Sequence, residues 1–124
     1  MITRRTFLKA CATAPLVAVL PSVATAAVVT PFPLTASKTK KRLVPGDGYQ
    51  DASVWAFNRS VPGPELRFKK GETLSVDFFN QLDEGSSVHW HGVRNINAMD
   101  GVAGLTQPEV MTDGQFRYEF PLKD

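Results

Sequence analysis

The strict alternation of apolar and polar side chains in ETLSVDFFN, residues 72–80, most constrains what this chain can fold into. Leu74, Val76 and Phe78 recur at every second position, which is the period of a strand with one buried face. The stretch FRYEF at 116–120 alternates aromatic and charged residues in the same way. Strands of this kind must bury their apolar face against a second layer, so the pattern predicts a β-structure.

Turn signals divide the rest of the chain into short pieces. VPGD, RSVPGPE and KKGE contain the Gly and Pro residues that favour turns, and they flank shorter strand candidates at 54–57 and 66–68. Beyond the N-terminal stretch, no segment has the apolar period of a helix and no internal repeat is present. We predict an all-β fold, a β-sandwich or barrel, for residues 41–124. Residues 27–40, which contain Pro31 and Pro33, are expected to form a linker or extended arm.

Residues 1–26 have the layout of an export signal. A basic start precedes an apolar stretch and then the A-x-A cleavage pattern Ala24-Thr25-Ala26. Pro15 and Pro21 interrupt the apolar stretch, which is also shorter than a membrane span, so no stable membrane anchor is expected. A membrane anchor or a buried helix is the alternative interpretation.

The paired Arg4 and Arg5 resemble a twin-arginine signal. That resemblance implies the twin-arginine export machinery as a partner and the bacterial periplasm as the location.

Cleavage after Ala26 would change the charge and the cysteine content. Three of the 14 lysines and arginines lie in the signal, which leaves 11 against 12 acidic residues. No strongly basic patch remains, so nucleic acid is not an expected partner. The run from Lys38 to Arg42 is interpreted as a solvated flank of the first strand. The one cysteine, Cys11, also lies in the signal, so the mature chain would have neither a disulfide nor a thiolate ligand.

The only two histidines of the chain, His89 and His91, lie two residues apart in SSVHWHGVR. On a strand, side chains at i and i+2 point to the same face, so both imidazoles would point away from Val88 and Trp90. Imidazole suits copper, zinc, iron and nickel. The alternative is a pair of polar residues on a solvated strand face, and two ligands are fewer than a closed metal site needs. Met99 and Met111 are further soft donors, although methionine more often fills gaps in a core.

The surrounding motifs make the chain similar to one family. WAFN, VPGPELR, KKGETLSV, FNQL, HWHG, MDGVAGLTQPEV and FRYEF occur in that order over residues 41–124. In this combination they resemble the N-terminal cupredoxin-like domain of multicopper oxidases, the laccase-like family. The resemblance implies a Greek-key β-sandwich.

The resemblance also implies roles for three residues. His89 would ligate the type 2 copper of a trinuclear cluster, and His91 would ligate one of the type 3 pair. Asp100, in the DGV motif, would be catalytic by helping to deliver protons to dioxygen, which the family reduces to water while a reducing substrate is oxidised. Without the resemblance, an Asp-Gly pair is more simply a turn.

The sequence departs from the family pattern in two respects. Ala103 replaces the usual proline of DGVPG, and the second H-x-H and the His-Cys-His of the family are absent. We therefore expect an N-terminal portion of a periplasmic multicopper oxidase, with an incomplete domain that is inactive alone. The alternatives are an exported non-catalytic binding or scaffold module and a small copper-binding protein.

Overall fold

The computed structural model describes residues 29–123, so the predicted export signal at 1–26 lies outside the described residues. Four strands form one sheet: β1 (Phe32–Lys41), β2 (Ala52–Phe57), β3 (Thr73–Asn80) and β4 (Gln115–Pro121). Their order across the sheet is β2-β1-β3-β4. β1 runs parallel to β3, whereas the β1–β2 and β3–β4 pairs are antiparallel. The all-β prediction is confirmed.

One expectation about the N-terminal part is wrong. The segment predicted to be a linker or arm, 27–40, contains most of β1, which lies in the interior of the sheet. Leu34 and Ala36 on this strand are buried in the core. Pro31 and Pro33 do exclude a helix, but Pro33 only removes one backbone donor, and the neighbouring residues still pair with β3.

The predicted strands at 54–57, 72–80 and 116–120 correspond to β2, β3 and β4. The short candidate at 66–68 is wrong, because these residues form no strand pairing. Leu66 packs against the core, whereas Phe68 is more than one-third exposed. The apolar residues at 66 and 68 therefore belong to a loop, in which only Leu66 contacts the core.

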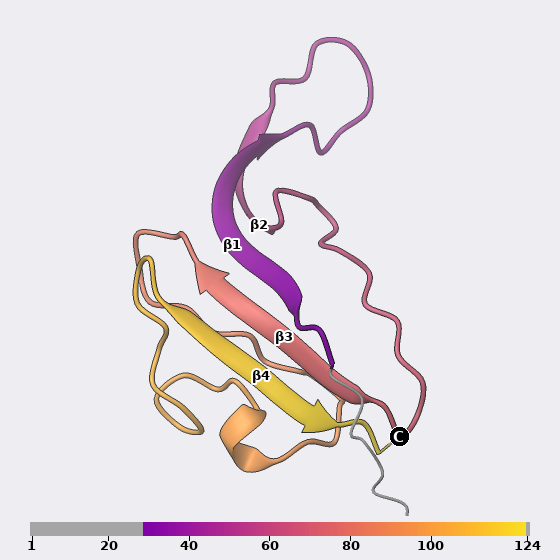
Figure 1. The fold of residues 1–124 in the computed structure, drawn as a ribbon. Coiled ribbons are helices and arrows are strands. Elements are labelled where there is room, and N and C mark those ends of the chain that lie inside the picture. Colours follow the sequence, from indigo (N-terminus) through magenta and orange to yellow (C-terminus); the bar gives the residue numbers. More distant parts are fainter. Residues whose placement is uncertain (1–28, 124) are drawn as a thin grey trace, which may run out of the picture.

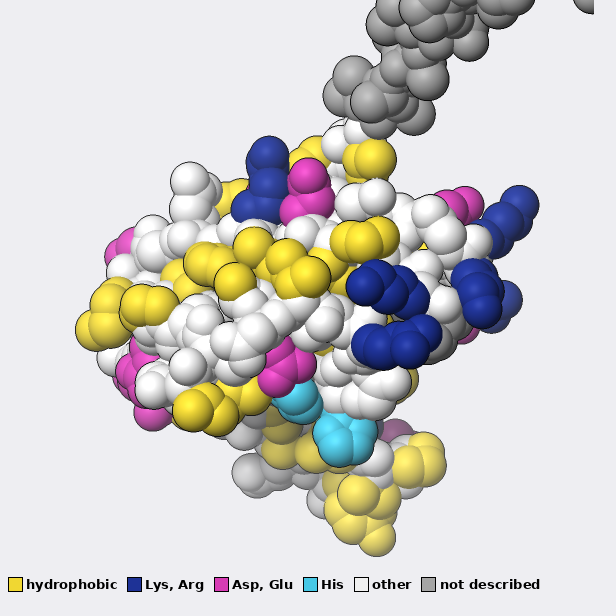
Figure 2. Space-filling model, turned by 90° about the horizontal axis from the view of Figure 1, so that it is seen from below, with side chains coloured by type: hydrophobic (Ala, Val, Ile, Leu, Met, Phe, Trp, Pro, Cys, Tyr) yellow, Lys and Arg dark blue, Asp and Glu magenta, His cyan; other side chains and the backbone are white. Residues whose placement is uncertain are grey.

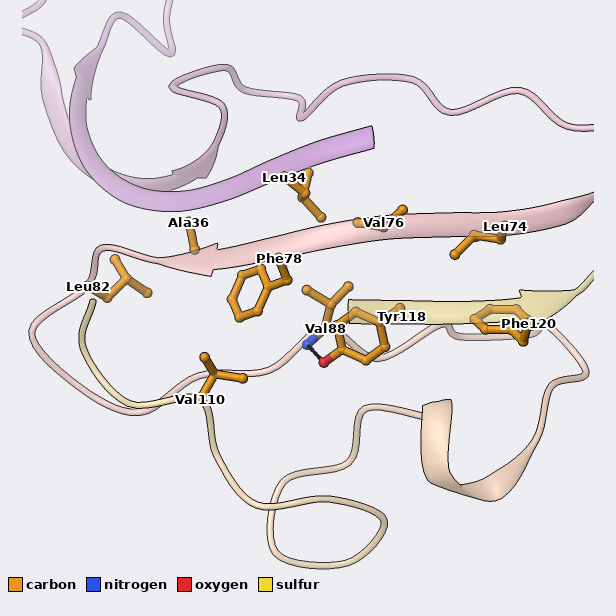
Figure 3. Packing of buried hydrophobic residues seen from close by; sticks show 10 residues of the cluster. All are labelled: Leu34, Ala36, Leu74, Val76, Phe78, Leu82, Val88, Val110, Tyr118 and Phe120. Atoms are coloured by element: carbon orange, nitrogen blue, oxygen red, sulfur yellow. Dashed lines mark hydrogen bonds between the residues drawn. The ribbon is translucent and has the colours of Figure 1, made fainter. Parts of the chain in front are cut away.

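The core lies between the β3–β4 part of the sheet and the long connection 81–114 (Figures 1 and 3). In the register of β3 and β4, Leu74 faces Phe120 and Val76 faces Tyr118, so their side chains share one face. Leu82, Val88 and Val110 from the connection join the same buried cluster, which also contains Leu34, Ala36 and Phe78. In the described residues, the irregular connection 81–114 thus covers the sheet where a sandwich would have its second sheet.

A short 3-10 turn, η1 (Asn97–Met99), is the one helical element of residues 29–123. No helix in this range has the length and apolarity needed to cross a membrane. Loops must satisfy their backbone polar groups without a ladder. The connection 81–114 does so mainly through backbone bonds within turns and bridges, and around the histidines also through side chains.

Candidate metal centre

The two histidines lie in the connection between β3 and β4, and not on a strand as predicted. Ser86 forms an isolated bridge with Val110, and residues 87–90, which follow it, have no strand pairing. A turn follows at His91 and Gly92, where the Val93 amide donates to the Trp90 carbonyl at 3.1 Å. The hydrogen bonds of this segment go to side chains and to other loops.

Along residues 88–91 the burial of the side chains still alternates, as predicted. Val88 is buried, and the Trp90 ring packs edge-on against Tyr118 and Phe120 at centroid distances of 5.5 and 5.9 Å. The rings of His89 and His91 lie on the opposite side, with centroids 5.7 Å apart and planes 73° from parallel. Figure 2 shows them as neighbours on the molecular surface. The pair is therefore accessible to a ligand and has a packed layer behind it.

Asp100 lies beside His89. The Nδ1–H of His89 donates to the backbone carbonyl of Asp100 at 2.8 Å. The carboxylate Oδ2 of Asp100 is 3.6 Å from the same nitrogen, and the two side chains are 30% and 44% exposed. A proton held on Nδ1 leaves the lone pair of Nε2 available to a metal. Asp100 thus orients His89 through its main chain and leaves its carboxylate exposed to solvent.

The hydroxyl groups of Tyr118 and Ser87 also hold the histidine segment, and neither residue was predicted to belong to the site. The buried Tyr118 hydroxyl accepts a hydrogen bond from the Val88 amide at 2.9 Å (Figure 3). Burial raises the pKa of Tyr118, and the hydrogen bonds from Val88 and Gln107 act in the opposite direction. The hydroxyl of Ser87 donates to the Gly101 carbonyl at 2.7 Å. Only Tyr118 could have been found by pattern, because it lies on the buried face of an alternating strand.

Gly101 permits the close approach of two loop segments. Gly101 is buried, and its φ is +76°. A Cβ atom there would overlap the Val88 carbonyl oxygen and would lie 3.0 Å from the backbone nitrogen of His89. Only glycine satisfies both the left-handed backbone and the missing space. The Asp-Gly pair is therefore both a turn and the contact surface for the histidine segment.

The donors present fit copper chemically but form only part of a closed site. Two imidazoles are suitable ligands for copper. Within residues 29–123, no three or more His, Cys, Asp or Glu side chains group closely enough to hold an ion. Met99 packs against the core, and Met111 is 65% exposed. Further donors would have to come from outside the described residues.

Comparison with known proteins identifies the family. The family model described as multicopper oxidase matches residues 38–124. The chain belongs to the multicopper oxidase family. Among curated relatives of this family, Laccase-1 of Cryptococcus neoformans var. neoformans is 39% identical over 97 residues, which cover 74% of this chain and 15% of that protein. The copper resistance protein A homolog of Pseudomonas syringae pv. tomato is 35% identical over 76% of this chain and 15% of its own length.

Solved structures of multicopper oxidases also resemble the chain. Lac15 from a marine microbial metagenome superimposes with a TM-score of 0.72 at 43% identity, over 77% of this chain and 25% of Lac15. The multi-copper oxidase of Pseudomonas thermotolerans gives a TM-score of 0.72 at 37% identity, over 80% of this chain and 24% of its own. The chain thus spans about 15% of the length of the curated relatives and about a quarter of these solved chains.

Proposed function

We propose that this chain is the N-terminal portion of a multicopper oxidase and supplies two histidine ligands to its copper cluster. His89 would ligate the type 2 copper and His91 one copper of the type 3 pair. The observation that carries the proposal is the pair of exposed imidazoles 5.7 Å apart on a segment backed by the core. Rings at this separation on one face can serve neighbouring ions. When bound, copper would supply the redox chemistry that reduces dioxygen to water.

The residues of the chain would contribute orientation and proton transfer. The hydrogen bond from His89 Nδ1 to the Asp100 carbonyl fixes the ring, and the packing of Trp90 on Tyr118 fixes the backbone between the two ligands. The Asp100 carboxylate, partly exposed beside His89, would relay protons from solvent toward dioxygen. For the reducing substrate, which the sequence does not identify, we propose a phenol or a cuprous ion; the relatives include proteins named laccase and copper resistance protein.

The location follows from the N-terminal signal. We propose export through the twin-arginine machinery to the periplasm, on the basis of Arg4, Arg5 and the cleavage pattern at Ala24–Ala26. Fractionation of cells that express the wild-type chain or Arg4→Lys/Arg5→Lys tests this proposal. A periplasmic product from the double variant would contradict it.

The decisive experiment uses the protein made from the complete reading frame. We would sequence the gene beyond the codon for Asp124, express the whole product, and measure bound copper and dioxygen consumption. His89→Ala and His91→Ala should each lose copper and lower the rate at least about 100-fold, whereas the exposed-surface control Lys70→Ala should match the wild type. Full copper content and activity in both histidine variants would refute the function.

A second candidate is a small copper-binding protein, because both imidazoles are exposed in the described structure. Two ligands bind loosely, so we expect the 124-residue chain alone to bind copper weakly and to lack oxidase activity. Equilibrium dialysis separates the candidates: tight one-to-one binding by the chain alone favours the small copper protein. A third alternative, an exported non-catalytic scaffold, predicts no copper binding by either the chain or the complete product.

A further inference from the structure

The backbone of the histidine segment has little support from strand pairing. Its last ladder-like contact is at Ser86, whose amide and carbonyl bond to Val110 at 3.0 and 2.9 Å. Beyond that point the polar contacts of residues 87–89 are made with side chains: the Ser87 hydroxyl, the Tyr118 hydroxyl and the His89 ring. A ligand held on such a segment depends on those side chains for its orientation.

Two of these contacts reach neighbouring carbonyls of one turn. The Ser87 hydroxyl donates to the carbonyl of Gly101 at 2.7 Å, and His89 Nδ1–H donates to the carbonyl of Asp100 at 2.8 Å. Ser87 and His89 are two residues apart, and both side chains reach the same turn, so they project to the same side. Their acceptors are consecutive carbonyls, which means that the first bond fixes the position of the second acceptor.

The histidine segment and the Asp100–Gly101 turn pack so closely that there is no space for a side chain at Gly101. A Cβ at that position would overlap the Val88 carbonyl oxygen, so the two backbones are in direct contact between the two hydrogen bonds. The Asp100 carboxylate does not replace the carbonyl, because its Oδ2 lies 3.6 Å from Nδ1, beyond a good hydrogen bond. The main chain of the turn therefore selects the tautomer of His89.

We propose that Ser87 is a positioning residue for His89: by tying Gly101 to the histidine segment, it keeps the Asp100 carbonyl on Nδ1 and so presents Nε2 as the free nitrogen. Without the Ser87 hydroxyl, the turn separates from the segment and the His89 ring loses its fixed tautomer. The metal-binding consequence rests on the proposed function, whereas the effect on the ring does not.

The test measures the tautomer of His89 directly in the copper-free chain of 124 residues. Long-range proton–nitrogen correlation spectra at a pH above the imidazole titration distinguish a protonated Nδ1 from a protonated Nε2. In the wild type, His89 should carry its proton on Nδ1. His91, whose ring has no hydrogen bond with residues 29–123, serves as the internal reference. Ser87→Ala should shift the His89 nitrogen resonances toward those of His91, and Ser87→Thr should restore them.

Matched variants exclude a general loss of structure. Asp100→Asn keeps the main-chain carbonyl and should leave the His89 tautomer unchanged. Unchanged His91 and Tyr118 resonances would show that Ser87→Ala keeps the fold. If Ser87→Ala does not fold, Ser87→Cys keeps the size of the side chain, has only a weak donor, and should give the same shift. A wild-type tautomer in a folded Ser87→Ala or Ser87→Cys chain would overturn the proposal.

Copper affinity gives the second measurement. In competition titrations of the full-length chain, Ser87→Ala should bind copper about 10- to 100-fold more weakly than Ser87→Thr, which is the usual cost of losing an outer contact of a ligand. Equal affinities together with an unchanged tautomer reject Ser87 as a positioning residue. A shifted tautomer in a chain whose copper binding does not depend on His89 supports the positioning role and rejects the proposed function instead.

Discussion

The two halves of the sheet differ in how completely their apolar side chains are covered. On β3 and β4, Val76, Phe78 and Tyr118 are fully buried under the connection 81–114. On β2, Trp55 is 56% exposed and Phe57 36% exposed, and both line an apolar groove of about 350 Å³. Figure 1 shows β1 and β2 curving away from the layer that covers β3 and β4. The histidines lie on the covered half, where packing can fix the backbone between them.

The sharpest way to break this contrast is to truncate one large side chain in each half. Phe120→Ala should lower the free energy of unfolding by about 3–5 kcal/mol, because Phe120 is 1% exposed and packs against Trp90. Trp55→Ala should cost less than about 1 kcal/mol, because that ring is already largely hydrated. Urea denaturation of both variants measures the difference. Equal losses would mean that the exposed half is covered in solution.

Two asparagines provide a smaller contrast of the same kind. Asn80 is fully buried, and its amide bonds to the backbone of Leu82, Glu84 and Val110. Asn80→Ala should cost about 3 kcal/mol, because buried polar groups lose their partners. Asn58 makes two similar bonds to the backbone of β1 but is exposed, so Asn58→Ala should cost about 1 kcal/mol. Thermal unfolding of both variants measures the two losses of stability. A larger loss in Asn58→Ala than in Asn80→Ala would contradict the interpretation.

The third prediction concerns the anchor beneath the histidines. Tyr118→Phe removes the oxygen that accepts the Val88 amide and should cost about 1–2 kcal/mol, because it leaves a buried N–H without a partner. Hydrogen exchange at Val88 should accelerate more than exchange at Val76 in the adjoining strand. Uniform acceleration at both amides would indicate a global loss of stability instead of a released segment.

The smallest effect comes from the cross-strand pair Asp77–Arg117. Both guanidinium contacts are short, 2.7 and 2.9 Å, and the hydrogen bonds from Arg117 lower the pKa of Asp77. Because the pKa of Asp77 is lower in the folded protein, the ion pair stabilises the fold at pH values above the ordinary pKa near 3.8. This stabilisation is lost as the pH falls through the pKa of the folded state. Asp77→Asn should therefore flatten the stability profile below about pH 4. Added salt should weaken the Lys38–Asp83 pair more than this one, because the Asp83 side chain is 72% exposed and the Asp77 side chain only 29%.

The strands were predictable from sequence where one face is buried and the alternation is strict, as in β3 and β4. β1 was missed because β2 flanks it on one side and β3 on the other, and its run PFPLTASKTKK has no clean period of two. The histidine pair and Asp100 were predicted as neighbours through motif resemblance. Their contact through a main-chain carbonyl could not be predicted, because it depends on the approach of Gly101 to Val88 in three dimensions.

The hydrogen bond between Val88 and Tyr118 also has a consequence for folding during synthesis. The two residues are 30 positions apart, and the ribosome makes the histidines well before it makes the strand that holds them. Until β4 is paired with β3, the Val88 amide has only water as its acceptor, and Trp90 has no ring of Tyr118 or Phe120 to pack on. The histidine segment therefore lacks these anchors until β4 has been made, and a copper ion that arrives earlier would meet two imidazoles without them.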